Sequence, residues 1–221
     1  NVDDSTSLSD LSQIVVSNND FSGSDAGAAN KALSLTLDAS ENYWGTDNPN
    51  FNSVISGDVN YQPWYATSDF SEDVEVVDSS GDTRAYSGTI QEALNVAAED
   101  ATIELGPGTY EENVSIDTSN ITLQGPNAGI DANRDVRSDE AVITGQVGIG
   151  AQKVTVNGLK VTPTTETFNQ KPAAAIIVSE SDATVQNNRI ADFNVSITDI
   201  EPNSIQGIQI YNSGTQISGI E

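Results

Sequence analysis

The sequence contains one run of alternating oxygen-bearing side chains that could hold a metal ion. Asp131, Asn133 and Asp135 recur at every second position, and Asp139 and Glu140 follow a few residues later. Alternating carboxylate and amide oxygens are the ligands that Ca²⁺ prefers. The run lacks the glycine and the closing glutamate of the common helix–loop–helix calcium loop. We therefore expect a solvated acidic loop without a cofactor, with a calcium site at these residues as the alternative.

Aromatic side chains gather in the part of the sequence before residue 71. The group is made up of Tyr43, Trp44, Tyr61, Trp64, Tyr65 and Phe70. Exposed aromatic rings can stack on sugar rings, which makes part of this group a candidate carbohydrate-binding site. The candidate residues are Tyr43, Trp44, Trp64 and Tyr65. The alternative, which we expect, is that the rings seal the end of an apolar core.

Carboxylates are so frequent that pairs of them say little about catalysis. Glycoside cleavage needs two carboxyl groups about 5–10 Å apart, one with a raised pKa. The acidic residues that could line one face are Asp117, Glu180, Asp182, Asp192 and Asp199. Among 33 acidic residues such coincidences arise by chance. The sequence also has no His and no Cys, which removes the commonest general base and the thiol nucleophile. We predict no catalytic residues.

Sequons of the form Asn-x-Ser/Thr begin at Asn113, Asn120 and Asn194. In exported proteins such sequons accept N-linked glycans and lie on surface loops. They agree with an extracellular protein, although a sequence this rich in Asn, Ser and Thr could contain them by chance. We treat the three asparagines as candidate N-glycosylation sites.

The charge balance is strongly acidic, with a formal net charge of −25. In dilute buffer this excess should push a compact chain apart, whereas in molar salt the Debye length falls to about 3 Å. The carboxylates are scattered among regular aliphatic positions, so we predict adaptation to high salt rather than a disordered acidic tail. Nucleic acid is excluded as a partner because no basic stripe exists. No apolar run approaches the roughly 20 residues of a membrane span, so membrane insertion is not expected.

Short β-rich segments recur from residue 101 onward, for example at 101–105, 121–123, 153–156 and 207–210. Each has few residues and is bounded by Gly, Asn, Asp, Ser or Pro turns. A β-sandwich would show fewer and longer strands with hairpin turns. A parallel β-helix stacks one short strand per side in each coil, which fits this spacing better. The predicted fold is therefore all-β, a right-handed parallel β-helix.

One short amphipathic helix is predicted at about residues 89–98, before the first of these strands. Its apolar positions follow the i, i+3, i+4, i+7 spacing and are Ile90, Ala93, Leu94 and Ala97. Ser87 or Thr89 can serve as the N-cap, and Glu92 completes a capping box with Thr89. We expect this helix to cover the open first coil, with a position on the outside of the coil as the alternative.

Two groups of motifs resemble known β-helix proteins. Residues 42–45 (Asn-Tyr-Trp-Gly) and 55–64 resemble the terminal coil of right-handed β-helix repeat proteins, which are common at the surface of haloarchaea. Residues 88–94 and 101–110, with Ile121-Thr-Leu-Gln-Gly125, resemble the opening of a pectin-lyase-like β-helix, as in periplasmic copper-processing proteins. The resemblance implies the fold. It implies little about activity, because this superfamily includes enzymes, adhesins, tailspikes and scaffolds.

The resemblance also suggests an unusual order, with an end pattern before a start pattern. Residues 1–66 would be the C-terminal coils and end cap of one β-helix module, and residues 67–86 an acidic linker. Residues 87–221 would be the capping helix and N-terminal coils of a second module, left open at residue 221. An excerpt from a longer tandem array would explain this order. Alternatively, the first coils of one copy would complete the last coil of another in a filament.

The expected function is structural. We predict an extracellular segment at a cell or virion surface that acts in adhesion, filament or spike assembly. Its partners would be copies of itself or neighbouring modules stacked end to end, together with surface glycans. The alternative is a β-helix that binds or cleaves polysaccharide, such as a viral tailspike.

Overall fold

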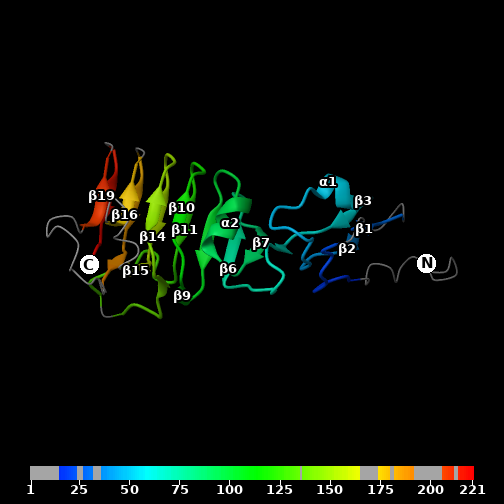
Figure 1. Ribbon diagram of the computed structural model, residues 1–221, viewed down its shortest axis with the longest axis horizontal. Coiled ribbons are helices and arrows are strands. Elements are labelled where there is room, and N and C mark those ends of the chain that lie inside the picture. The colour runs from blue at the N-terminus through cyan, green and yellow to red at the C-terminus, as the bar shows by residue number, and fades with distance from the viewer. Residues whose placement is uncertain are drawn as a thin grey trace.

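The chain winds into a parallel β-solenoid of about five turns, with little helix. The computed structural model describes residues 15–23, 27–31, 36–134, 136–164, 174–179, 182–191, 206–211 and 214–221. The first strands and β19 lie at opposite ends of an elongated molecule (Figure 1). The predicted all-β fold and its parallel β-helix are confirmed.

The first turns use very short strands and a single helical turn. Their elements are β1 (Ala28–Ala29), β2 (Leu37–Asp38), α1 (Phe51–Val54), β3 (Ile55–Ser56), β4 (Val59–Asn60) and β5 (Trp64–Tyr65). β1 pairs with β3, and β2 pairs with β4, both in parallel. Isolated parallel bridges from Asp20 to Tyr43 and from Tyr43 to Tyr65 continue the stacking on a further side. These turns therefore stack one above the other.

Two strands join the first turns to the later ones, β6 (Val74–Val77) and β7 (Thr83–Ser87). They lie inside an eight-stranded sheet of order β20-β17-β14-β11-β8-β6-β7-β5, which we call the long sheet. β7 is parallel to β5, whereas β6 is antiparallel to both β7 and β8. Residues 67–86, predicted as an acidic linker, therefore contain two strands of the long sheet. The division of the chain into modules stays a prediction.

From β8 onward the chain forms a regular three-sided coil. The elements of this part are α2 (Ile90–Val96), β8 (Thr102–Leu105), β9 (Gly108–Tyr110), β10 (Val114–Ile116), β11 (Thr122–Gln124), β12 (Ala141–Ile143), β13 (Val147–Ile149), β14 (Thr155–Asn157), β15 (Lys160–Val161), β16 (Ala174–Val178), β17 (Thr184–Gln186), β18 (Arg189–Ile190), β19 (Gln206–Ile210) and β20 (Gln216–Ser218). β8, β9 and β10 form one turn, and β11, β12 and β13 form the next. Pairing between successive turns is parallel on every side. Each turn thus contributes one short strand to each side.

The core consists of columns of aliphatic side chains that run along the solenoid. The column inside the long sheet contains fully buried side chains, namely Val76, Ile103, Leu123, Val156 and Val185. Burial of one such side chain contributes about 1.5–3 kcal/mol. The same position on β20 is held by Ile217, which is 44% exposed. In the middle turns each side chain of this column is therefore covered by the turn before it and the turn after it. Ile217, on the last described strand, stays partly exposed.

Helix α2 confirms the predicted helix and its N-cap. The Thr89 hydroxyl accepts a hydrogen bond from the Glu92 amide (3.2 Å) and donates one to the Glu92 carboxylate (2.7 Å). One half of the predicted capping box is therefore present, whereas the Thr89 amide donates to the Ser87 hydroxyl (3.1 Å) and not to Glu92. The helix buries Ile90, Ala93, Leu94 and Val96. It packs against β6, β7, β8 and β10, so it covers the start of the regular turns as expected.

Polar contacts fix α2 to the edge strand β10. The Gln91 side chain donates to the Ser115 carbonyl (3.3 Å) and accepts from the Ser115 amide (2.8 Å). A neighbouring strand would make the same pair of bonds. The Glu112 carboxylate accepts from the amides of Ile90 (2.8 Å) and Gln91 (3.0 Å). The positive end of the helix dipole favours a carboxylate at this place.

Buried asparagines connect successive turns at their corners. The Asn188 side chain accepts from the Leu159 amide (2.9 Å) and donates to the Val156 carbonyl (2.9 Å). Asn42 accepts from the Asn19 amide in the preceding turn (2.9 Å). Asn42 and Asn188 are completely buried. Because buried backbone groups need partners, these amides complete the hydrogen bonding where the strands end.

Candidate functional site

The aromatic candidates divide between the two faces of the long sheet. Trp64 belongs to the inward column, whereas its neighbour Tyr65 pairs with Tyr86 in an outward column. Adjacent strand residues point to opposite faces. Trp44, Trp64 and Tyr65 are 6%, 2% and 3% exposed, respectively. Tyr43 is half-buried. The four rings therefore do not form one exposed surface.

The two tryptophans pack in a group of rings inside the first turns. The ring centroid of Trp44 lies 4.8 Å from that of Phe21 and 5.9 Å from that of Phe51. Phe51 is also 5.0 Å from Trp64, whose indole N–H donates to the Asp47 carbonyl (3.2 Å). Rings enclosed in this way seal an apolar core, which is the second of the two sequence interpretations. They offer no open face to a sugar.

Tyr65 lies on the outward face but is covered there. Its hydroxyl donates to the Glu72 carboxylate (2.7 Å), and the Phe70 ring lies 5.1 Å away, centroid to centroid. Burial, reinforced by the hydrogen bond to Glu72, raises the pKa of Tyr65 well above its ordinary value. Tyr65 therefore stays neutral and enclosed. Of the four carbohydrate candidates, Tyr43 alone keeps a partly exposed ring.

The proposed calcium ligands lie on the loop between β11 and β12. Asp131 and Asn133 are exposed, and Asp135 lies outside the described residues. The Asp131 carboxylate accepts hydrogen bonds from the amide (3.0 Å) and the side chain (3.3 Å) of Asn133, which stabilises a local turn. Within the described ranges, no group of three or more acidic residues is placed to hold a metal ion. The calcium site stays a prediction from sequence alone.

The same loop has a clear structural role. Residues 125–134 and 136–140, which we call the strap, cross the corners of the later turns. The Gly129 amide donates to the side chain of Asn157, the last residue of β14 (3.2 Å). The Ala132 amide donates to the Gly219 carbonyl after β20 (3.3 Å). The strap thus joins turns that are not neighbours along the chain.

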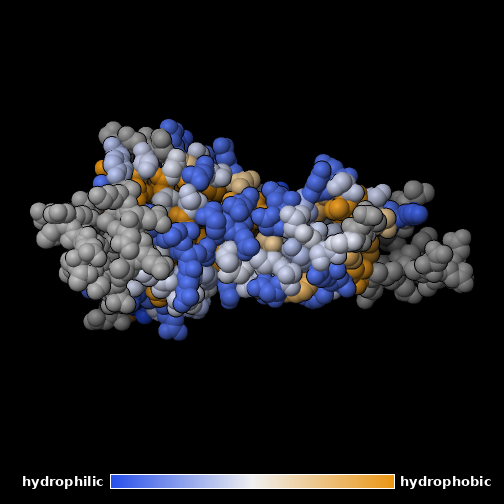
Figure 2. Space-filling view, viewed as in Figure 1, coloured by the Kyte–Doolittle hydropathy of each residue, from blue (hydrophilic) through white to orange (hydrophobic). Residues whose placement is uncertain are grey.

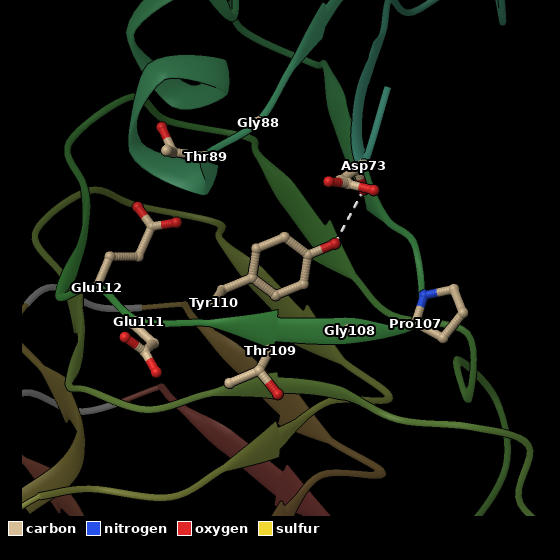
Figure 3. Close-up of a pocket in the computed structure, with 9 residues that line it drawn as sticks. All are labelled: Asp73, Gly88, Thr89, Pro107, Gly108, Thr109, Tyr110, Glu111 and Glu112. Atoms are coloured by element: carbon tan, nitrogen blue, oxygen red, sulfur yellow. Dashed lines mark hydrogen bonds between the residues drawn. The ribbon is translucent and has the colours of Figure 1, made fainter. Parts of the chain in front are cut away.

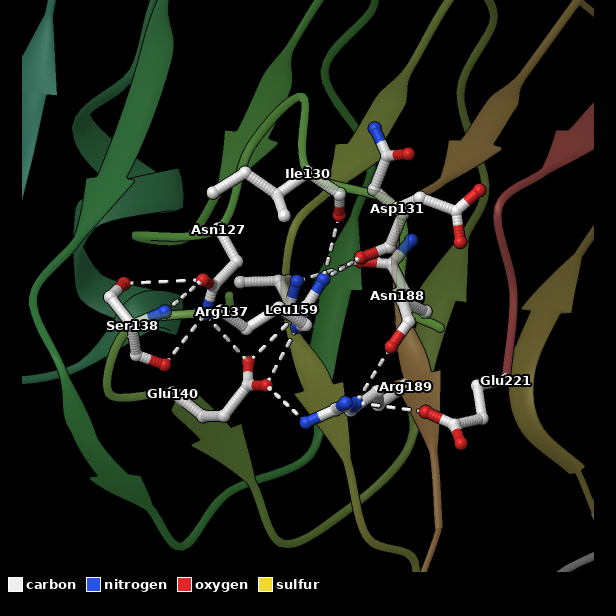
Figure 4. Close-up of polar contacts among 12 residues, drawn as sticks. Asn127, Ile130, Asp131, Arg137, Ser138, Glu140, Leu159, Asn188, Arg189 and Glu221 are labelled. Carbon is white, nitrogen blue, oxygen red and sulfur yellow. Dashed lines mark hydrogen bonds and ion pairs between the residues drawn. The ribbon is translucent and has the colours of Figure 1, made fainter. Parts of the chain in front are cut away.

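An arginine–glutamate network holds the strap in place (Figure 4). The Arg137 guanidinium donates to both carboxylate oxygens of Glu140 (2.8 and 2.9 Å) and to the Asn187 carbonyl after β17 (2.9 Å). The Arg137 side chain is 2% exposed. Arg189 lies 3.4 Å from the Glu140 carboxylate and 3.0 Å from that of Glu221. Charge-assisted bonds of this bidentate kind are strong and directional.

The surroundings of Glu140 favour its ionised form. Burial alone would raise the pKa of Glu140, but the hydrogen bond and charge of Arg137 act in the opposite direction. Asn127 and Arg189 add to this effect, and the pKa is held below its ordinary value. In the sequence, Glu140 appeared beside the candidate calcium ligands. In the structure it is the carboxylate of an internal ion pair.

A small cavity of about 200 Å³ lies beside the start of α2 (Figure 3). Its lining includes Asp73, Thr89, Tyr110, Glu111 and Glu112. The Tyr110 hydroxyl donates to the Asp73 carbonyl (2.9 Å), and burial raises the pKa of Tyr110 to about 12. Glu112 is already occupied by the amides of α2. Sites for small molecules usually have about 300–1,000 Å³, so this cavity is small for a ligand.

The carboxylates considered for glycoside cleavage are not brought together among the described residues. Asp117 and Asp182 are exposed and lie on different turns. Outside the described residues lie Glu180, Asp192 and Asp199. A different pair, Glu75 and Glu104, is directly opposed across β6 and β8. Sequence reasoning missed this pair because β6 falls in the predicted linker.

The sequons occupy different environments. Asn113 is exposed, and its side-chain oxygen accepts from the Gln146 amide of the next turn (2.9 Å). Asn120 is half-buried and has a positive φ of 61°. Asn194 lies outside the described residues. Of the two described sequons, Asn113 is the more accessible, and glycosylation stays a prediction for all three.

The outward face of the long sheet carries two columns of side chains in register, which sequence reasoning did not identify. The first column is Thr102, Thr122, Thr155, Thr184 and Gln216. The second column is Glu104, Gln124, Asn157, Gln186 and Ser218. From β11 to β20 neither column contains a charged residue. The alternation was visible in the sequence, but the register between turns was not.

The geometry therefore defines a parallel β-solenoid protein with an apolar interior and a hydrogen-bonding outer face. No family model, curated protein or solved structure matches the chain. Among the described residues, no helix has both the length and the apolar character needed to cross a membrane.

Proposed function

We propose that this chain is a structural segment of a salt-adapted extracellular protein, which acts at the surface of a cell or virion in adhesion, filament or spike assembly. The observation that carries the proposal is the long sheet, which continues from β5 to β20 through both sets of turns. Its rungs pair along the axis of the molecule, and the core columns fill its interior. Such an arrangement makes a stiff rod.

The same proposal includes a relationship of this chain to one particular group of β-helix proteins. The regular three-sided winding and the helix at its start support a relation to pectin-lyase-like β-helices of haloarchaeal surface proteins. The motifs at residues 42–45 and 88–94 carry that relation at the level of sequence.

The charge distribution supports adaptation to salt. The chain has a net charge of −25, and hydrophilic residues are more frequent than hydrophobic ones among the coloured residues of the face seen in Figure 2. The apolar residues seen on that face form separate patches (Figure 2). An acidic surface of this kind is stable when mobile ions screen its repulsion. A saline extracellular environment would supply those ions.

The edge strands β19 and β20 support end-to-end stacking with another copy or a neighbouring module. Ile210 is 39% exposed and Ile217 is 44% exposed, whereas their partners Val178 and Val185 are fully buried. A further turn of the same kind would cover both isoleucines and pair with both edges. This is the partner that the uncovered core columns fit best.

Two measurements test the proposal together. Small-angle scattering and electron microscopy in molar salt should show a rod whose cross-section is one solenoid turn. Incubation with a panel of polysaccharides should release no new reducing or unsaturated ends. A compact particle would overturn the rod, and release of sugar products lost on Glu75→Gln or Glu104→Gln substitution would replace the structural role by an enzymatic one.

A further inference from the structure

One strand edge at the start of the regular turns has no neighbouring strand, and a cavity lies beside it (Figure 3). Three strands begin these turns, and two of them are covered at the edge where the turns start. β8 pairs with β6, and β10 is covered by the Gln91 side chain, which bonds to the Ser115 backbone. β9 is the outermost strand of the sheet β18-β15-β12-β9. Among the described strands, none pairs with the outer edge of β9.

The backbone of Thr109 directs its hydrogen-bonding groups toward this open edge. In the ladder between β9 and β12, the Gly108 amide donates to the Glu140 carbonyl (3.0 Å). The Tyr110 carbonyl accepts from the Thr144 amide in the same ladder (2.9 Å). Alternate residues of a strand bond to opposite neighbours, so the amide and carbonyl of Thr109 face away from β12. Thr109 therefore offers one donor and one acceptor to a further strand.

The cavity supplies the space that such a strand would need. It has a volume of about 200 Å³ and lies between β9 and the residues Gly88 and Thr89 (Figure 3). One residue of a strand fills roughly 160 Å³, from a rise of about 3.3 Å, a strand spacing of about 4.8 Å and a sheet spacing of about 10 Å. The cavity therefore accepts about one residue of an extended chain. A Cβ atom on Gly108 would meet no other atom within 4 Å, so this end of β9 is not crowded.

Charge narrows the side chains that this extended chain can carry. The lining of the cavity includes the carboxylates of Asp73, Glu111 and Glu112 and no basic residue. Glu112 binds the amides of α2, and Asp73 accepts from the Ser71 hydroxyl (3.0 Å). Glu111 has no such partner among the described residues, so it favours a basic side chain beside it. This preference holds at moderate salt, where the Debye length of about 8 Å exceeds a contact distance, and fades in molar salt.

We propose that the outer edge of β9 binds an extended basic peptide segment of a partner protein, which adds to the sheet as a further strand. Main-chain hydrogen bonds to Thr109 give the affinity, and a basic side chain beside Glu111 gives the selectivity. The proposal goes beyond the structural role, because it gives the solenoid a partner along its side and not at its ends. If water alone occupies the edge, the experiment below will show it.

Peptide titrations followed by NMR test the proposal. The probe is a short peptide with blocked ends in which threonine and lysine alternate. One comparison peptide has glutamate in place of each lysine, and another has every backbone amide methylated. The titrations are run at the lowest KCl concentration at which circular dichroism shows an intact fold, and again in molar KCl. Thr109→Pro removes the amide of the open edge without removing a bond to β12, whereas the matched control Thr109→Val keeps that amide.

We expect millimolar lysine peptide to shift the Thr109 amide resonance saturably and to slow its hydrogen exchange. Thr109→Pro should weaken binding about tenfold, because a main-chain hydrogen bond is lost. Thr109→Val should bind within about twofold of the unmodified chain, since its amide is retained. The methylated peptide should not bind. The glutamate peptide should bind more weakly at low salt, and Glu111→Gln should reduce this difference.

Unchanged exchange of the Thr109 amide, or equal binding by Thr109→Pro, overturns the proposal. Equal binding of the methylated peptide also overturns it, because strand pairing would then not be the mode of binding. Equal binding of the lysine and glutamate peptides at low salt overturns the basic selectivity. The exchange measurement uses the unmodified chain, so it decides the question even if the proline variant does not fold. Scattering by the same samples reports the rod shape separately, which distinguishes this failure from failure of the structural role.

Discussion

The Arg137 guanidinium binds the Glu140 carboxylate through two parallel hydrogen bonds of 2.8 and 2.9 Å while its side chain is 2% exposed. The same guanidinium reaches the Asn187 carbonyl, 50 residues later in the chain. Arg137 therefore connects two positions within the strap and also connects the strap with a later turn. This contact explains why a polar loop of an acidic chain lies in a defined position.

Removal of this arginine should destabilise the whole solenoid. Arg137→Met leaves Glu140 without its main partner, and loss of one member of a buried ion pair costs about 3–5 kcal/mol. Arg134→Met, an exposed position on the same strap, should change the free energy of unfolding by no more than about 0.5 kcal/mol. Urea unfolding followed by circular dichroism measures both. Equal stability of the two variants would show that the network does not hold the strap.

The same ion pair predicts a dependence of stability on pH. The pKa of Glu140 is lower in the folded chain than its ordinary value of 4.5, so ionised Glu140 stabilises the fold above that pH. This contribution is lost as the pH falls below 4.5 through the lowered pKa. The difference in unfolding free energy between the unmodified chain and Glu140→Gln should therefore shrink on acidification. The comparison cancels the effect of the other carboxylates, and a difference that is constant from neutral to acidic pH would contradict it.

Gly158 lies directly beneath the strap and should therefore not tolerate a side chain. Its φ is +75°, and a Cβ atom would lie 2.1 Å from the Ala128 amide nitrogen of the strap. Gly81 has a similar φ of +89° but open space around it. Gly81→Ala should cost about 1–2 kcal/mol for the left-handed backbone alone, and Gly158→Ala clearly more. Thermal unfolding measures both, and equal losses would mean that the strap moves aside freely.

Salt should raise the stability of this chain until its charges are screened. With a net charge of −25, the melting temperature should rise steeply with KCl and level off near molar concentration, where the Debye length is about 3 Å. The variant Glu99→Gln, Glu111→Gln, Asp139→Asn removes three exposed charges. It should melt higher than the unmodified chain in dilute buffer and show a smaller rise with salt. A melting temperature that falls with added KCl would contradict adaptation to salt.

The elements that follow local rules were predictable from the sequence. The alternation of Thr122, Leu123 and Gln124 indicated a strand with one buried side chain, and Thr89 with Glu92 indicated the start of α2. Alternation also separates Trp64 from Tyr65, because neighbours in a strand face opposite sides. A sugar-binding surface that included both rings would therefore have to span both faces of the sheet, and the carbohydrate site stays a prediction.

Features that depend on register or on distant contacts were not predictable. The strap is polar and lacks periodicity, and its partners lie in turns that the sequence does not place beside it. The strands at residues 74–77 and 83–87 lie among acidic residues, which made them resemble a linker. The column of threonines on the long sheet becomes visible only when the strands of four turns are aligned. This alignment is hard to infer from the sequence, because loops of different size connect the strands and the turns therefore differ in length.

The hydrogen bonds between the Gln91 side chain and the Ser115 backbone have a consequence for the solubility of the protein. A bare strand edge is a template on which extended segments of other molecules add, and that process leads to amyloid. Here a side chain on a helix occupies the hydrogen-bonding groups at that edge, and a helix cannot propagate the sheet. The molecule is thus protected from uncontrolled growth at β10 by a residue that belongs to no strand.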